Sequence, residues 1–149
     1  MPKHFKIRYV FLAVPLLIVG LFALFMLVEC SWVAREKSYY TEKDNFVTAT
    51  ATITSIREYE DGTLYLELGQ IESNTVFSDI AFKLLPKSAS KVRYEGFFAE
   101  VKTGDRITFV AAPRLFGDGY AVPIVCISAE GKEYLPFDIG HSHLMEYYE

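Results

Sequence analysis

The pattern of hydrophobic and polar positions begins with an unbroken apolar segment, residues 10–28, which reads VFLAVPLLIVGLFALFMLV. It contains no charged side chain, and a helix of this length is roughly 28 Å long at about 1.5 Å per residue. That length matches the hydrocarbon core of a bilayer, in which a helix satisfies its own backbone hydrogen bonds. The segment therefore predicts a single transmembrane helix that anchors the protein in a cell membrane.

The flanking charges predict the orientation of this anchor. The short tip before it, residues 1–9, contains Lys3, Lys6 and Arg8 and no acidic residue. Basic residues stay on the cytoplasmic side of a membrane span. We therefore expect the N-terminus in the cytoplasm and everything after the anchor outside it, as an extracytoplasmic domain.

A cleaved signal peptide and a lipoprotein signal are the two alternatives for the N-terminal segment. A cleaved signal peptide has the same basic tip but a shorter apolar region and a pair of small residues at the cleavage site. The segment here is followed by Glu29 and Cys30, and a lipoprotein signal needs a small residue where Glu29 stands. An uncleaved anchor is the interpretation that these features favour.

After the anchor, residues 29–45 mix charges with aromatic residues, which predicts a short extension of the helix followed by a linker. Strict alternation then starts at residue 46. Val47, Ala49, Ala51 and Ile53 fall on one face and threonines on the other, which is typical of a half-buried strand over residues 46–57.

Further strands follow the first at short intervals. Asp61-Gly62 predicts a tight hairpin turn into a strand over residues 63–69, and a third strand is expected over residues 76–85, before Pro86. Residues 88–101 suit one or two short helical pieces broken by Gly96, and strands over 106–115 and 120–129 come after them. The predicted inward side chains are Ile53, Leu64, Leu66, Leu68, Ile80, Phe82, Leu84, Ile107, Phe109 and Ala111.

The order strand, strand, strand, helix, strand, strand predicts an all-β domain with one short helical connection. It matches the OB-fold, a five-stranded, partly open Greek-key barrel, over residues 46–136. An immunoglobulin-like sandwich would need about seven strands. From residue 137 to 149 the chain has no clear period and is expected to be an irregular tail.

An anchor followed by such a barrel resembles the membrane-anchored haem chaperone of cytochrome c maturation. The stretch that carries the resemblance contains Tyr94-Glu95-Gly96 before a short helix, and Tyr134 in the position of the family's tyrosine. The position of the family's haem-attaching histidine is Glu130 here. The resemblance therefore implies the fold and the topology, without the family's defining chemistry.

Charge and cysteine content narrow the choice of partner. From residue 29 onward the chain has 12 Lys and Arg against 19 Asp and Glu, a net charge of −7, which is a poor match for nucleic acid. The chain contains only Cys30 and Cys126. Cys126 lies in an apolar run and is expected to be a small buried residue, with a disulfide to Cys30 as the alternative.

Few residues suggest chemistry. Seven aromatic residues of the domain could stack on a ligand, although core and barrel-rim positions are the simpler explanation: Tyr59, Tyr65, Tyr94, Phe97, Phe98, Phe116 and Tyr120. His141 and His143 would point the same way on an extended chain and could bind one metal ion, with Glu146 or a tyrosine as a further ligand. The alternative is a solvated tail whose histidines have no function.

No metalloprotease, P-loop or dinucleotide-binding motif is present in the sequence. We therefore expect a non-catalytic interaction module without a cofactor, tethered through residues 10–28. Its expected partner is another membrane or extracytoplasmic protein and not a nucleic acid. The alternatives are a haem or metal carrier and an enzyme whose nucleophile and base the sequence does not identify.

Overall fold

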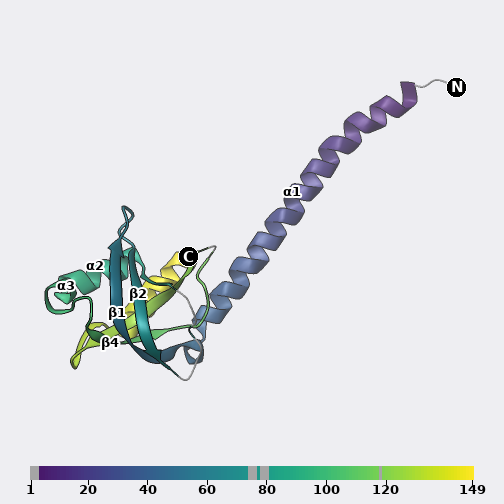
Figure 1. Cartoon of the computed structure of the whole chain (residues 1–149). Helices are drawn as coiled ribbons and strands as arrows, with labels where there is room; N and C mark the ends of the chain where they lie inside the picture. Colours follow the sequence, from purple (N-terminus) through teal and green to yellow (C-terminus); the bar gives the residue numbers. More distant parts are fainter. Residues whose placement is uncertain (1–3, 74–76, 78–80, 118) are drawn as a thin grey trace. The chain divides into compact units, whose positions relative to one another are not determined.

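A computed structural model describes residues 4–73, 77, 81–117 and 119–149 (Figure 1). The chain divides into two units, Met1–Glu36 and Lys37–Glu149. Helix α1 (His4–Thr41) makes up the described part of the first unit and contributes its last turn to the second. The helix therefore continues beyond the apolar segment, as far as Thr41.

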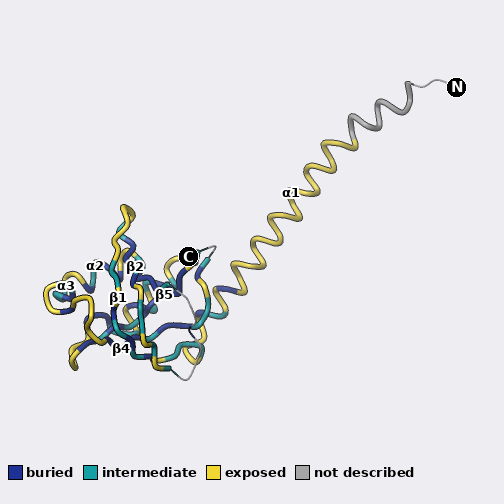
Figure 2. Tube along the Cα trace, viewed as in Figure 1, coloured by how far each residue is buried: buried dark blue, intermediate teal, exposed yellow. Residues whose placement is uncertain are grey.

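Helix α1 is long and apolar enough, from Ala13 onward, to cross a membrane. Its large apolar side chains between Val14 and Val28 are exposed, Leu27 to 69%, and this stretch is yellow in Figure 2. Pro15 lies inside the helix. Exposure along the whole stretch distinguishes α1 from the core helix of a soluble protein, which would be buried.

The second unit is built around a closed five-stranded barrel. The strands pair in the order β3-β2-β1-β4-β5, and a parallel pairing between β3 and β5 closes the ring. A sixth strand follows β5 after a turn at residues 130–131 and pairs with β5 outside this ring. The bounds are β1 (Val47–Glu58), β2 (Leu64–Glu72), β3 (Ala81–Leu84), β4 (Arg106–Ala111), β5 (Ala121–Ala129) and β6 (Lys132–Leu135).

Strand β1 takes part in both sides of the barrel. Its first half, Val47 to Thr52, pairs with β4, and its stretch from Thr50 to Glu58 pairs with β2. Two register shifts interrupt the pairing with β2, and such bulges bend a strand and increase its twist. One long strand can therefore turn the corner that closure of a small barrel requires.

The predicted inward side chains form the core. Ile53, Leu64 and Leu66 are at most 1% exposed, and the rings of Phe82 and Phe109 meet edge to face at 4.9 Å. Leu68 is half-buried against this core, and Ile80 lies outside the described residues. The face assignment made from the alternating pattern is thus confirmed for the strands that the structure describes.

Two short helices follow β3, as predicted: α2 (Pro86–Tyr94) and α3 (Phe97–Glu100). Pro86 occupies the first turn of α2, where its missing N–H costs no hydrogen bond. Gly96 separates the helices with a φ of 84°, which a residue with a Cβ atom adopts only with strain. Val92 and Phe97 are completely buried in the barrel core.

The expectation of an irregular tail is wrong. Phe137–Met145 forms helix α4, followed by a short 3₁₀ turn, η2 (Glu146–Tyr148). Leu144 is fully buried, in a second cluster with Tyr40, Phe116 and Val125. The helix is only nine residues long and buries few positions, so its period is too short to detect in the sequence.

The end of α1 and the segment after it also pack on the second unit instead of forming a free linker. The Tyr40 hydroxyl donates to the carbonyl oxygen of Arg114 at 3.1 Å, and its ring lies 6.0 Å from that of Phe116. A 3₁₀ turn, η1 (Lys43–Asn45), then leads into β1. The boundary predicted at residue 46 for the folded domain is therefore several residues too late.

Candidate functional site

A pocket of about 520 Å³ lies on the second unit. Five parts of the chain line it: the β1–β2 turn, strands β2 and β3, the start of α2, the loop between β4 and β5, and the C-terminal segment. Its size lies in the usual range of small-molecule sites. We call it the β2–β3 pocket.

Asp61 forms the hairpin side of this pocket. Its carboxylate accepts the backbone N–H of Thr63 at 2.8 Å and the Thr63 hydroxyl at 2.9 Å. These two hydrogen bonds lower the pKa of Asp61 below its ordinary value, and Lys83 lowers it further. The carboxylate is therefore ionised at neutral pH and held in a fixed direction by its own turn.

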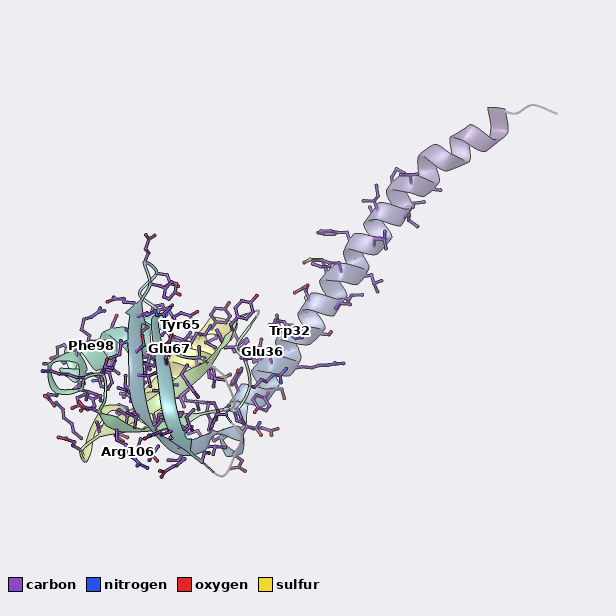
Figure 3. All side chains as sticks on the ribbon, in the orientation of Figure 1. Trp32, Glu36, Tyr65, Glu67, Phe98 and Arg106 are labelled. Atoms are coloured by element: carbon purple, nitrogen blue, oxygen red, sulfur yellow. The ribbon has the colours of Figure 1, made fainter. Side chains whose placement is uncertain are left out.

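Tyr65 forms the strand side. Side chains alternate along β2, and Figure 3 labels Tyr65 and Glu67, two positions apart on the outward-facing side of that strand. Tyr65 is half-buried, and its ring lies 4.8 Å from the ring of Tyr59. Across the ladder it pairs with Lys83 of β3, so the two residues are neighbours on the same face of the sheet.

Lys83 connects the strands to the β4–β5 loop. Its ammonium nitrogen lies 4.5 Å from the centroid of the Phe116 ring, a cation–π contact. Phe116 is 3% exposed, while Tyr147 is 66% exposed and meets the Phe116 ring edge to face at 4.6 Å. The pocket therefore has a buried aromatic wall and an accessible tyrosine at its rim.

The C-terminal segment supplies the remaining polar groups. His143 Nδ1 and the Ser88 hydroxyl are hydrogen-bonded at 3.0 Å, and Lys87 forms an ion pair with Glu146. Burial lowers the pKa of His143, and nearby Lys87 adds to this, against the raising effect of Glu146. The hydrogen bond from Lys87 lowers the pKa of Glu146. At neutral pH the His143 imidazole is therefore neutral and the Glu146 carboxylate is ionised.

The structure does not bring the two predicted metal ligands together. His141 Nε2 donates to the carbonyl oxygen of Tyr40 at 2.8 Å, and its ring stacks on Phe137, whereas His143 faces Ser88. The prediction assumed an extended chain, but two residues apart on a helix differ by about 200° in direction. Among the described residues, no group of three or more His, Cys, Asp or Glu side chains is placed to hold a metal ion.

A second hollow lies beside α3 and the β5–β6 turn. The Tyr134 hydroxyl donates to Glu100 at 2.7 Å, and Lys132 pairs with the same carboxylate. Tyr134 is 3% exposed, and burial, followed by the bond to Glu100, raises its pKa to about 12. The Tyr134 hydroxyl therefore links β6 to α3 through Glu100. In the turn between β5 and β6, Glu130 adopts a φ of 50°.

Cys30 and Cys126 are both free thiols. Cys126 is half-buried, with its sulfur 3.6 Å from a Glu133 carboxylate oxygen. The structure therefore has no disulfide between Cys30 and Cys126. The expectation that Cys126 is buried holds in part, because this residue is only half-buried. Burial, and then Glu133, raise the pKa of Cys126 to about 11, which keeps this thiol protonated.

Some residues of the β2–β3 pocket were considered as ligand-binding residues from the sequence, but nothing in the sequence indicated that they lie together. Tyr65 and Phe116 belong to the set of aromatic residues considered for stacking, and both line the pocket, whereas Phe97 is core. Asp61 was considered only as a turn residue and His143 and Glu146 only as metal ligands, and Lys83 and Tyr147 were not grouped with any of them. Pairing of β2 with β3 and folding of the C-terminus bring these residues together, and neither contact is visible in a local pattern.

Comparison of the chain with protein-family models, with curated proteins and with solved structures finds no match in any of the three.

Proposed function

We propose that this protein is a single-pass membrane protein with a cytoplasmic N-terminus, and that its extracytoplasmic barrel is a non-catalytic binding module of the OB type. The observation that carries the proposal is the position of the β2–β3 pocket on the barrel. The membrane part rests on the exposed apolar stretch of α1 and on the basic residues of the tip.

The strand order supports the OB assignment. The ring β1-β2-β3-β5-β4 closes through a parallel β3–β5 pair, and helices lie between β3 and β4. Barrels of the OB type bind ligands on strands 2 and 3 and with the loops after strands 1 and 4. These parts of the chain contribute half of the lining of the β2–β3 pocket, and the start of α2 and the C-terminal segment complete it. The analogy with other OB barrels supports the pocket as a binding site. The ligand has to be inferred from the side chains of the pocket itself.

The chemistry of the pocket supports binding in preference to catalysis. Ser88 and His143 have the residue types of a nucleophile and its base, but Ser88 is 1% exposed, so its hydroxyl cannot reach a substrate. Asp61 and Glu146 both have lowered pKa values, which makes them poor general acids. These groups are suited to hold a ligand in place.

Site-specific photo-crosslinking in intact cells tests this proposal. A benzophenone amino acid at Tyr65 or Tyr147 should form adducts, because both residues line the pocket. The same amino acid at Tyr94, which is 86% exposed and does not line the pocket, is the matched control. Equal adduct yields at all three positions would show that this pocket is not the binding surface.

A further inference from the structure

We propose that the β2–β3 pocket binds an uncharged oligosaccharide of the extracytoplasmic space. The inference rests on the proposed function, because it names the ligand class of the same pocket. Three observations carry it: the balance of charge in the pocket, the accessible tyrosine rings, and the lack of an open strand edge where the ligand would lie.

The charges of the described lining residues cancel. Asp61 and Glu146 provide two carboxylates, and Lys83 and Lys87 provide two ammonium groups, while burial keeps His143 neutral. An anionic ligand such as a nucleic acid or a phosphate would face both carboxylates, and a cationic ligand would face both lysines. Like charges in contact oppose binding, so the pocket suits a ligand without net charge.

Hydrogen-bond donors and acceptors both line the pocket. Carboxylate oxygens of Asp61 and Glu146 accept, the two lysines donate, and His143 keeps Nε2 for a ligand because Nδ1 is bonded to Ser88. A sugar hydroxyl donates and accepts at once, so it can bridge neighbouring groups of opposite type. Internal contacts such as the Lys87–Glu146 ion pair and the Asp61–Thr63 bonds hold these groups in position before a ligand arrives.

Two tyrosine rings border the polar groups. Tyr65 is half-buried on β2, and Tyr147 is 66% exposed at the C-terminal rim. The face of an aromatic ring is electron-rich, and it attracts the C–H groups that point from one face of a sugar ring. Rings on two different elements can contact successive sugar units of one chain.

Among the described residues of β2 and β3 that line the pocket, none offers an unpaired strand edge to an extended peptide. Strand β3 pairs with β2 on one side and with β5 on the other, and residues 64–66 of β2 pair with both β1 and β3. Recognition by strand addition needs an unpaired backbone edge. A peptide would have to bind through side chains alone, whereas a sugar chain needs no backbone partner.

Titration of the full-length protein with neutral tetrasaccharides tests the inference. The protein is held in phosphatidylcholine nanodiscs, since maltoside detergents would present a competing sugar, and it is probed with cello-, malto-, manno- and chitotetraose and with a printed array of neutral glycans. At millimolar concentrations we expect saturable binding of at least one class, with affinity unchanged between low and high salt because no net charge is screened.

Matched variants localise the binding. Tyr65→Ala and Tyr147→Ala should each weaken it about fivefold, the usual value of one aromatic contact, whereas Tyr94→Ala should leave it unchanged. Circular dichroism of each variant checks that the domain is folded. If a variant is unfolded, nuclear magnetic resonance shifts in the unmutated protein locate the site instead.

Three results would overturn the inference: no binding by any neutral glycan, stronger and salt-sensitive binding of an anionic polysaccharide, or binding that Tyr94→Ala weakens as much as Tyr147→Ala. Crosslinks from Tyr65 and Tyr147 to a protein, without glycan binding, would replace the sugar by a protein partner and leave the proposed function standing. If neither selective crosslinks nor glycan binding were found, both the sugar ligand and the proposed binding function would be ruled out.

Discussion

Leu66 and Thr50 occupy opposite faces of the barrel wall. Leu66 is 0% exposed, whereas Thr50 is half-buried and accepts a hydrogen bond from Arg106 on the outer side. The Arg106 guanidinium also pairs with Glu72. Substitutions that add the same charge at these two positions therefore separate the inner face from the outer one.

Leu66→Asp should lower the free energy of unfolding by several kcal/mol, because it buries a charge without a partner. A domain has only about 5–15 kcal/mol of stability in total, so this variant is expected to be largely unfolded. Thr50→Asp should cost less than about 1 kcal/mol, since its carboxylate lies beside Arg106. Urea denaturation of both forms is the measurement, and equal losses would contradict the face assignment.

Cys126 should react slowly with iodoacetamide. Its pKa of about 11, against an ordinary value of 9.0, means that the thiolate fraction at pH 8 is about a hundredfold below that of an unperturbed thiol. Since the pKa is raised, reactivity should increase with pH up to about pH 11. Mass spectrometry of Cys126 alkylation against pH measures this.

Glu133→Gln is the control for the cause of that shift. Burial contributes most to the raised pKa and the Glu133 carboxylate contributes next, so removing the charge should speed alkylation without restoring the ordinary rate. A rate at pH 8 equal to that of an unfolded control peptide would contradict the buried position of the thiol.

At the scale of elements, the contact between α4 and β5 depends on Gly140. A Cβ atom at this position would lie 2.0 Å from the carbonyl oxygen of Val125, which belongs to the backbone of β5. The strand cannot move without disturbing the barrel, so the helix would have to withdraw. Leu144, on the same helix, is fully buried and would lose contacts with it.

Gly140→Ala should therefore lower the free energy of unfolding by about 2 kcal/mol or more, as overpacking does. Helix propensity alone predicts the opposite sign, because alanine stabilises a helix by about 1 kcal/mol relative to glycine. Ser142→Ala, at an exposed position of the same helix, is the control and should be neutral or slightly stabilising. Thermal melts compare the variants, and a more stable Gly140→Ala form would show that α4 does not pack on β5 in this way.

For the whole molecule, the proposed arrangement in the membrane has a direct test. Protease added to spheroplasts should digest the part of the chain after the anchor and spare a tag fused to residue 1, because the basic tip lies on the cytoplasmic side. A cytoplasmic protein is the control for intact spheroplasts. A protected C-terminus with a digested N-terminal tag would reverse the orientation.

Much of this molecule follows from its sequence alone. A long run of apolar side chains is most stable away from water, and α1 exposes the part of that run whose burial the structure describes, residues 13–28. Alternation with a period of two fixed which side chains of β1, β2 and β4 are inside, because a slip of one residue would place the whole polar set in the core. Pro86 marked the end of the third strand and Gly96 the break between the helical pieces, because both residues restrict or extend the backbone angles locally.

Contacts between distant segments determined the rest. Helix α4 packs on β5 at Gly140. The helix therefore depends on contact with a distant strand, and the local sequence pattern of residues 137–145 does not show that contact. That helix separates His141 from His143, which an extended chain would have aligned, and brings His143, Glu146 and Tyr147 to Lys83 and Asp61. Local periodicity specifies what each segment buries, whereas the β2–β3 pocket arises only from which segments meet.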